Sequence, residues 1–291
     1  MDSFLKRYYQ KRKIVLCKGE NLHNLITLVW NRVLMLKLQI HKWIHGIHHP
    51  IVHYYAVCWN EEKLLPFMFD YYRQFVDHFT IYDNYSDDHS DEIIRLHKNA
   101  DIIKFKTDGF DDTIHAQIKN NCWKKSRGKA DYVIVCDVDE FIYHSQIKSF
   151  INMIMKQKIT LPTPIGYSMY AESFPEYSKD FTIIQLVRKG VRDNYYSKNL
   201  LFDPHRVVEI NYTAGSHVCH PVGKIVKGDE YKVLHYKNMD IEAVIARNRV
   251  YAERLSTNNI IKKFGVHYLR DEEKIRSNFE QNLKKSEVVI D

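Results

Sequence analysis

Glycine and proline are scarce in this chain of 291 residues, which contains 10 glycines and 7 prolines. So few turn-forming residues exclude collagen-like, low-complexity and largely disordered chains. Hydrophobic residues make up 45% and charged residues 27%, which is the balance of an ordinary globular protein. The length is sufficient to bury a substantial core, in one large domain with extensions or in two small domains.

Cysteine is also uncommon, and its five positions are scattered without any C-x-x-C pair. Three of the five lie inside apolar runs, where cysteine usually acts as a small core residue. An odd and dispersed set predicts neither a disulfide framework nor a structural zinc site, and it favours a reducing compartment. The cysteines are Cys17, Cys58, Cys122, Cys136 and Cys219.

Long apolar runs are missing as well, since none reaches the roughly 18 residues that a transmembrane helix needs. Basic residues between positions 6 and 13 precede no clean apolar stretch, so the pattern of a signal peptide is not seen. Together with the unpaired cysteines, this predicts a cytoplasmic protein. Contact with the inner membrane surface, through residues 1–44, would make it peripheral to that membrane.

Acidic residues are rare in the first part of the chain. Residues 1–49 carry nine Lys and Arg against two Asp and Glu, and this surplus equals the whole formal net charge of +7. The rest of the chain is therefore neutral. A basic extension beside a neutral body argues against a nucleic-acid groove across the body, so we expect no nucleic-acid partner.

An amphipathic helix is predicted over residues 22–44, because apolar side chains recur there every three or four residues. Arg32, Lys37 and Lys42 contribute to a polar, cationic side. Such a helix could lie on an anionic membrane surface. Its apolar stripe could also pack against the protein's own core or a second subunit, which is the commoner arrangement.

From residue 51 the pattern changes to alternating strands and helices, which predicts a parallel sheet covered on both faces. In such sheets, ligands bind at the carboxyl ends of the strands. The predicted strands are 51–58, 78–83, 101–106 and 132–136, and the helices between them begin near residue 65 and cover 91–98 and 113–126.

Beyond residue 160 the predicted elements are shorter. They are strands over 165–171, 182–187 and 231–235, and helices over 241–255 and 272–285. The predicted organisation is a helical extension over 1–49, an α/β domain over 50–260 with halves 50–145 and 146–260, and a helical segment over 261–291.

Acid-bearing clusters follow three of the predicted strands, at Asn60-Glu61-Glu62, Asp83–Asp88 and Asp137–Phe141. The first two are also ordinary capping and turn sequences. The third places two carboxylates directly after a buried strand, where little would neutralise them. Paired acids of this kind favour a divalent cation with oxygen ligands, Mn²⁺ or Mg²⁺, which can in turn bind a diphosphate.

The run from Tyr55 to Phe141 resembles the nucleotide-sugar half of GT-A glycosyltransferases, in particular the inverting family 2-like and family 92-like enzymes. The resemblance covers residues 51–145 best, weakens to about residue 255 and is absent from 1–49. The matching segments are AVCWNEEKLLPF (56–67), IYDNYSDDHSDEI (81–93), QIKNNC (117–122) and DYVIVCDVDEF (131–141).

This resemblance implies a GT-A fold, which is a mostly parallel, Rossmann-like sheet with helices on both faces. It implies a D-x-D pair in which Asp139 holds the metal on the diphosphate and Asp137 lies near the ribose or the metal. The residues that it places around the nucleoside are Asn60, Glu61, Asp83 and Asn84, with Asp83 as the candidate for reading the base.

The C-terminal half resembles these enzymes less closely. Lys198 lies in a segment similar to the one that precedes their metal histidine, and its ammonium could hold phosphate oxygens. Phe202-Asp203 departs from the pattern of that segment. His217, in Gly-Ser-His, and His235, in Leu-His-Tyr, are both candidates for the third metal ligand, and the sequence does not choose between them.

An inverting transferase also needs a carboxylate that deprotonates the acceptor hydroxyl. Glu172 is our first choice because it follows a predicted strand and lies beside aromatic residues, and Asp193 is another option. The expected function is metal-dependent transfer of a sugar from a nucleoside diphosphate, with UDP expected because it is common in such folds, to a glycan acceptor. The alternatives are a nucleotidyltransferase and a non-enzymatic module that binds membranes or nucleic acid through the basic N-terminus.

Overall fold

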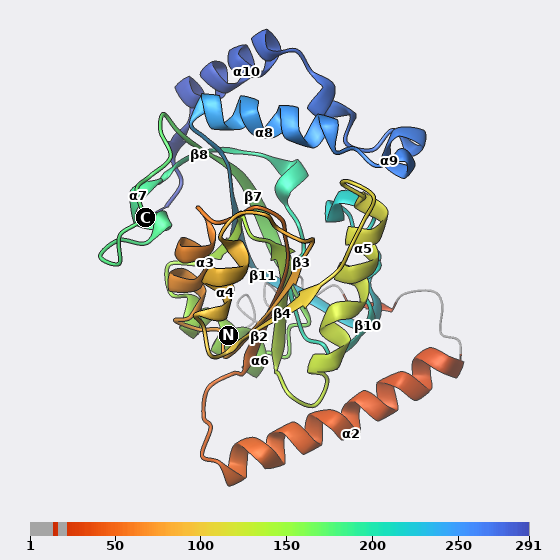
Figure 1. Ribbon diagram of the computed structural model, residues 1–291. Helices are drawn as coiled ribbons and strands as arrows, with labels where there is room; N and C mark the ends of the chain where they lie inside the picture. The colour runs from red at the N-terminus through yellow and green to blue at the C-terminus, as the bar shows by residue number, and fades with distance from the viewer. Residues whose placement is uncertain (1–13, 17–21, 291) are drawn as a thin grey trace.

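The computed structural model describes residues 14–16 and 22–290, so Cys17 and the basic residues at positions 6–13 lie outside the described residues. The described residues form two sheets that meet in the middle of the molecule (Figure 1). The first has the order β4-β3-β2-β5-β9, and its first four strands are parallel. These strands are β4 (Ala100–Lys104), β3 (His78–Asp83), β2 (Val52–Cys58), β5 (Tyr132–Asp137) and the short β9 (Leu201–Phe202).

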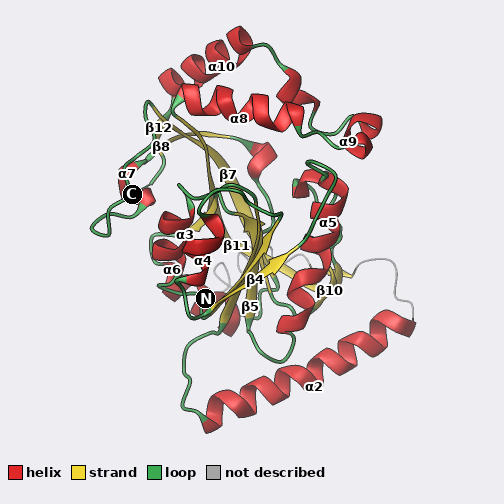
Figure 2. Ribbon diagram, viewed as in Figure 1, coloured by secondary structure: helices red, strands yellow, loops and turns green. Residues whose placement is uncertain are grey.

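Helices cover both faces of this sheet, as Figure 2 shows. Alternate residues of β2 and β5 belong to different cores: Tyr54 and Ile134 pack with α3, whereas Tyr55 and Val133 pack with Trp123 on the opposite face. This alternation is the two-residue period of a strand that is buried on both sides. The helices are α3 (Leu65–Tyr72), α4 (Ser90–Arg95), α5 (Asp112–Asn121) and the 3₁₀ turn η1 (Cys122–Ser126).

The second sheet is built around β11 (Val222–Met239), which runs parallel to β7 (Leu161–Ala171) and antiparallel to β6 (Glu140–Tyr143). Because β6 follows β5 after one tight turn, it carries the chain from the first sheet into the second. The other strands of this sheet are β1 (Ile14–Leu16), β8 (Lys189–Arg192), β10 (Val207–Glu209) and β12 (Glu287–Val288).

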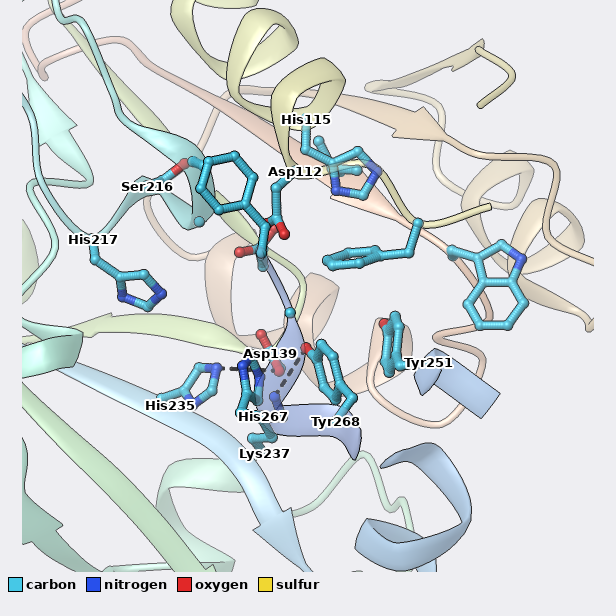
Figure 3. A pocket seen from close by; sticks show the side chains of 18 of the residues that line it. Asp112, His115, Asp139, Ser216, His217, His235, Lys237, Tyr251, His267 and Tyr268 are labelled. Carbon is cyan, nitrogen blue, oxygen red and sulfur yellow. Dashed lines mark hydrogen bonds and ion pairs between the residues drawn. The ribbon is translucent and has the colours of Figure 1, made fainter. Parts of the chain in front are cut away.

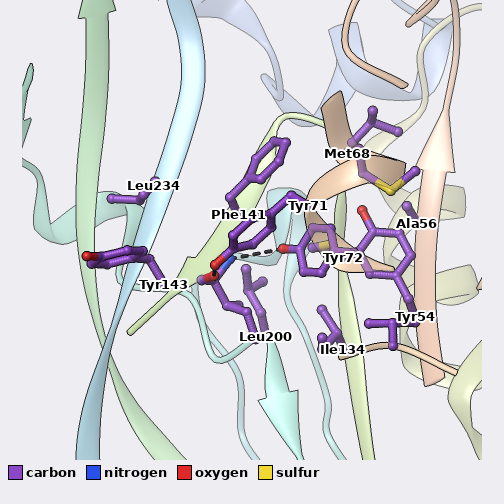
Figure 4. Packing of buried hydrophobic residues seen from close by; sticks show 14 of the residues in the cluster. Tyr54, Ala56, Met68, Tyr71, Tyr72, Ile134, Phe141, Tyr143, Leu200 and Leu234 are labelled. Atoms are coloured by element: carbon purple, nitrogen blue, oxygen red, sulfur yellow. Dashed lines mark hydrogen bonds between the residues drawn. The ribbon is translucent and has the colours of Figure 1, made fainter. Parts of the chain in front are cut away.

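Tyrosine hydroxyls fix β6 against α3 inside the largest core (Figure 4). The Tyr71 hydroxyl donates to the Ile142 carbonyl at 2.7 Å, and the Tyr72 hydroxyl donates to the Glu140 carbonyl at 2.9 Å. The Tyr72 oxygen also accepts from the Ile142 amide at 2.9 Å. Both hydroxyls are therefore satisfied in an apolar interior, and the backbone around Glu140 is held in place.

The C-terminal helices lie together at one end of the molecule (Figure 1). They are α8 (Ile241–Glu253), α9 (Thr257–Lys262) and α10 (Glu272–Lys285), with the 3₁₀ turn η4 (Val266–Leu269) between α9 and α10. The two predicted helices over 241–255 and 272–285 are thus confirmed. The predicted α/β class, with a mostly parallel sheet and an N-terminal helix, is also confirmed.

The predicted strand over 182–187 is wrong. These residues form the short helix α7 (Ile183–Leu186), because Thr182 and Gln185 make a capping box. The amide of Thr182 donates to the Gln185 side chain at 2.9 Å, a local interaction that its apolar residues do not reveal. The sequence also missed α6 (Ile147–Lys156), and the predicted helix over 113–126 ends as the 3₁₀ turn η1.

The helix α2 (Leu22–Ile44) lies across the amino-terminal edge of the parallel sheet (Figure 1). Its Leu38 packs with Ile51 and Ala130, which precede β2 and β5, and its Lys42 pairs with Asp131 at 2.6 Å. The predicted helix over 22–44 is confirmed residue by residue. Among the described residues, no helix is long and apolar enough to cross a bilayer.

Candidate functional site

A cavity of about 390 Å³ opens where β2 and β5 end, at the carboxyl edge of the parallel sheet. Residues from α5, β11, α8 and η4 complete its wall, so both sheets contribute to it (Figure 3). Ten of the residues that line it carry a charged side chain. Its charged residues are Glu61, Asp112, Lys119, Asp137, Asp139, Lys198, Lys237, Arg247, Arg254 and Lys263.

Asp137, the last residue of β5, lies between two buried lysines. Lys119 of α5 approaches its Oδ1 at 2.6 Å, and Lys198 lies 3.7 Å from its Oδ2. Burial alone would raise the pKa of Asp137, but the two ammonium groups outweigh it and hold the pKa below its ordinary value. Asp137 is therefore ionised and its charge is already balanced by the protein.

Asp139 pairs with His235, whose Nε2 lies 3.3 Å from its Oδ2. The contact follows from the register, since β6 and β11 place His235 opposite Glu140 and the Tyr236 amide donates to the Asp139 carbonyl at 2.8 Å. Burial would raise the pKa of Asp139, but His235 and the nearby cations lower it. The pair joins the motif after β5 to a strand that lies about a hundred residues later.

Glu140 is completely buried and forms a 2.5 Å ion pair with Lys198. Its other oxygen accepts from the Asp137 amide at 3.0 Å, so it also fixes the turn that carries the two aspartates. Burial would lower the pKa of Lys198, but Glu140 and Asp137 raise it well above the ordinary value. The sequence analysis missed the role of Glu140, although the residue directly follows the D-x-D pair.

His217 lines the same cavity but is held elsewhere in it (Figure 3). Its ring stacks on Tyr195 with centroids 3.5 Å apart, and its Nδ1 lies 2.8 Å from the Tyr195 carbonyl oxygen. Burial and the charge of Lys198 lower its pKa to about 3. Of the two candidate histidines, the structure brings His235 to Asp139 and leaves His217 apart from it.

A second cluster of charged residues, Glu61, Lys237 and Arg247, lies on the side of the cavity near α8. Burial and the charge of Asp139 raise the pKa of Glu61 to about 8, against the opposing effect of Arg247. Burial and the charge of Arg247 lower the pKa of Lys237 to about 8. Lys237 comes two residues after His235 on β11, and both side chains line the cavity.

Residues 50–286 match the model of glycosyltransferase family 92. The chain belongs to glycosyltransferase family 92. The family resemblance predicted from the segments around the D-x-D pair is thereby confirmed. Among curated proteins, none matches the sequence.

Solved structures resemble this family 92 chain only distantly. A structure of GalNAc-T7 with UDP, GalNAc and Mn²⁺ has 11% identity and a TM-score of 0.41, covering 84% of this chain and 59% of that one. The chain thus spans about three-fifths of that relative. A mannosyl-3-phosphoglycerate synthase from Rubrobacter xylanophilus has 10% identity and a TM-score of 0.37, covering 75% of this chain and 77% of that one.

The four residues predicted to surround the nucleoside lie in different positions relative to the cavity. Glu61 and Asn84 line the cavity, and the Asn84 amide donates to the Thr107 hydroxyl at 2.7 Å. Asp83 lies beneath the cavity lining, completely buried, and pairs with Lys104 at 2.7 Å. Asn60 lines a neighbouring cavity and donates to Asp87.

The two predicted general bases also differ in position. Asp193 lines a cavity of about 420 Å³ that shares Tyr195, Tyr196, Lys237 and His267 with the first one. Its Oδ1 caps the 3₁₀ turn η2 (Asn194–Tyr196) by accepting from the Tyr195 amide at 2.9 Å. Glu172 is exposed at the end of β7 and lines neither of these cavities.

Aromatic side chains form another part of the cavity lining. Tyr251 and Tyr268 stack with ring centroids 4.9 Å apart, and Phe110 meets the edge of Tyr251 at 5.1 Å. Arg254 lies over Trp59 at 3.2 Å from the ring centroid. A lining that combines aromatic rings with charged groups is suited to a ligand that has a planar or sugar portion and an anionic portion.

Proposed function

We propose that this family 92 chain transfers a sugar from a nucleoside diphosphate donor, UDP-sugar in the first place, to a glycan acceptor. The observation that carries the proposal is the pairing of Asp139 with buried His235 at the carboxyl edge of the sheet, within a cavity lined by cations. This arrangement supports a site for a diphosphate and a divalent cation.

The residues present offer two ligands for a Mn²⁺ or Mg²⁺ ion but not a complete coordination shell. Asp139 and His235 supply a carboxylate oxygen and the imidazole Nε2, which lie 3.3 Å apart. No group of three or more ligand side chains gathers within residues 14–16 and 22–290. Asp139 and His235 would therefore hold the ion, and the diphosphate and water would complete its shell.

A bound divalent ion supplies Lewis-acid stabilisation of the charge that develops on the departing nucleoside diphosphate. The chain's own cations support the same task, because Lys119 and Lys198 hold Asp137 ionised and lie beside the space for the phosphates. The aromatic wall of Tyr251, Tyr268 and Phe110 would receive the planar or sugar parts of the donor.

Asp193 is the better placed of the two candidate bases. Its cavity shares Tyr195 and Tyr196 with the lining of the donor cavity, which supports the approach of an acceptor hydroxyl from that side. The carboxylate would remove the proton of the acceptor hydroxyl as the hydroxyl oxygen attacks the anomeric carbon from the face opposite the diphosphate. This gives inversion, as the family resemblance implies.

The proposal is tested with purified full-length protein, a panel of UDP-, GDP- and dTDP-sugars, and either Mn²⁺ or EDTA. Release of free nucleoside diphosphate is measured with and without candidate glycans. We expect one donor to be cleaved, and EDTA or Asp139→Asn to lower the rate by at least about 100-fold. The control Asp101→Asn removes an exposed carboxylate and should stay within twofold.

Two results would contradict the proposal. One is release that persists unchanged in EDTA and in Asp139→Asn. The other is the absence of any calorimetric binding of the nucleoside diphosphates with Mn²⁺, because slow turnover without an acceptor cannot explain a loss of binding.

A further inference from the structure

The helix α2 presents its apolar side chains to solvent instead of to the protein. Six of them recur at spacings of three and four residues, which places them on one face. Their exposed fractions run from 49% at Val33 to 83% at Trp43, values typical of surface residues. The six are Ile26, Val29, Val33, Leu36, Ile40 and Trp43, and we call them the outer stripe.

The opposite face of α2 is the one that packs. Asn31 and Leu38, seven residues or about two turns apart, are 0% and 1% exposed. Leu34 lies against Gly128, and Lys42 pairs with Asp131 at 2.6 Å. The helix is thus held on the body by a mixed polar face, which leaves the outer stripe pointing away. In Figure 1 α2 lies at the outer edge of the molecule.

The charges around the outer stripe indicate what covers it. The sequence of α2 contains no Asp or Glu, whereas Arg32 and Lys37 lie among the stripe residues in the sequence and on either side of the stripe. Residues 1–21 add six further Lys and Arg against two acidic residues. Cations that flank an exposed apolar stripe complement anionic lipid headgroups.

A second copy of the chain fits the same stripe less well. Two α2 helices packed along their stripes would bring Arg32 and Lys37 near the same cations of the partner, with no acidic residue in either helix to pair with them. The stripe also includes Trp43, and Trp30 is 61% exposed nearby. Tryptophan is enriched where a bilayer meets water.

We propose that α2 is an interfacial anchor, which lies flat on an anionic membrane surface with the outer stripe in the headgroup region. At about 1.5 Å per residue, its 23 residues cover about 35 Å of membrane. Its packed face stays on the protein, so the contact needs no unfolding of the body.

The test is flotation of full-length protein with vesicles of phosphatidylcholine alone or with 30% phosphatidylserine. We expect binding to the anionic vesicles, weaker binding to the neutral ones, and loss of the difference at high salt. Val33→Asp and Ile40→Asp should each weaken binding by about tenfold, because each removes one apolar side chain that the membrane would bury. Leu96→Asp, at an 80% exposed apolar residue outside α2, should change nothing.

Donor cleavage is measured on the same samples, and Val33→Asp and Ile40→Asp should leave it unchanged because neither residue lines the cavity. A failure of anchoring is therefore distinguishable from a failure of the proposed enzyme. Two outcomes would overturn the anchor: no flotation with anionic vesicles, or a wild-type dimer in analytical ultracentrifugation that Ile40→Asp makes monomeric.

Discussion

Asp193 and Glu172 are both acidic residues of the second half of the chain, but only Asp193 lines a cavity next to the donor site. We predict that Asp193→Asn lowers sugar transfer by at least about 100-fold, because the amide cannot accept the proton of the acceptor hydroxyl. The amide oxygen can still cap η2, so the fold should persist. Calorimetric binding of the nucleotide should be unchanged, and Glu172→Gln serves as the control. Equal losses in both variants would contradict the assignment.

Lys198 is the cationic partner of Glu140, which is completely buried, and it also lies near Asp137. We predict that Lys198→Met lowers the free energy of unfolding by about 3–5 kcal/mol, because it leaves the buried Glu140 carboxylate without its partner, whereas Asp137 keeps Lys119. Urea denaturation measures the loss.

Lys124→Met is the matched control for Lys198→Met. It breaks a partly exposed pair with Glu209 and should cost at most about 1 kcal/mol. Adding Glu140→Gln to Lys198→Met should recover part of the stability. A double variant no more stable than Lys198→Met would show that charge burial is not the cause.

His53 is a neutral histidine in the folded protein, with its Nδ1 2.8 Å from the Ser126 hydroxyl. Burial, with the charges of His78 and Lys129, lowers its pKa to about 4 from an ordinary value of 6.5. Between these two pH values the unfolded chain binds a proton that the folded chain does not. The free energy of unfolding therefore falls as the pH drops from about 6.5 to about 4, by about 3 kcal/mol from this group.

The measurement is urea denaturation at pH 7.5 and at pH 4.5. The loss of stability between them should be smaller in His53→Gln than in the wild type by about 2–3 kcal/mol. His48→Gln, at an exposed histidine, should lose as much as the wild type. An unchanged loss in His53→Gln would mean that the histidine is not buried as described.

At the scale of elements, β7 supports the segment that carries Asp193, Tyr196 and Lys198. A Cβ on Gly166 of β7 would overlap backbone atoms of Asp193, Tyr196 and Ser197, none of which can rotate away. We predict that Gly166→Ala costs about 1–3 kcal/mol and weakens nucleotide binding, since it displaces this segment. Thermal unfolding and calorimetry measure the two effects.

Gly228 on the neighbouring β11 provides the control for Gly166. A Cβ there would meet Cδ1 of Ile159 at 3.2 Å, the flexible end of a side chain. Gly228→Ala should therefore cost less than about 1 kcal/mol and leave nucleotide binding intact. If the two variants behaved alike, the support of the site by β7 would be disproved.

Local sequence patterns were enough to find the parallel sheet and the edge where the site lies. A buried strand that ends at a site leaves a continuous apolar run followed directly by polar residues. The run before Asp137 and the acidic residues after it show this pattern in the sequence. The sequence suggested Lys198 and His235 as site residues, but it showed neither their ion pairs nor the role of Lys119, because all three lie far from the paired acids or in other parts of the fold. Thr182–Val187 was misread since its side-chain cap outweighs its strand-like residues.

Asp83 illustrates the same limit at a single position. It ends β3 in the expected place, but Lys104 on the adjacent β4 pairs with it and Ser86 donates to it, which keeps it beneath the cavity lining. The sequence also did not determine what the apolar stripe of α2 contacts. Periodicity shows that a helix has an apolar and a polar face, but it does not show which face packs on the protein.

At the scale of the whole molecule, the residues before position 50 meet the α/β body through one face of α2, where Leu38 packs on Ile51 and Lys42 pairs with Asp131, and through the three-residue strand β1 at the edge of the second sheet. We predict that a chain of residues 50–291 folds, cleaves the donor within about twofold of the full-length rate and does not float with anionic vesicles. The reason is that the family match begins at residue 50 and the cavity lining contains no residue before Val57. Circular dichroism, the release assay and flotation measure the three properties.

An inactive or unfolded chain of residues 50–291 would show that α2 or β1 is part of the body. A Lys42→Met variant of the 291-residue chain removes only one contact between α2 and the body. It tests whether a single weakened contact already affects folding or activity. It should retain activity and lose about 1–3 kcal/mol of stability, because the side chains of this ion pair are only 12% and 15% exposed.

The helix α2 and the cavity lie at opposite edges of the parallel sheet, which would fix the distance between a membrane bound by α2 and the cavity opening. The seven residues of β2 alone separate the two edges by about 23 Å, at about 3.3 Å per residue. With α2 lying on a bilayer, the catalytic opening would stand above the headgroups, whose layer is only about 5–8 Å thick. A sugar attached directly to a lipid would be out of reach, whereas the distal end of a longer glycan would meet the opening. The enzyme would then extend chains that already project from the surface.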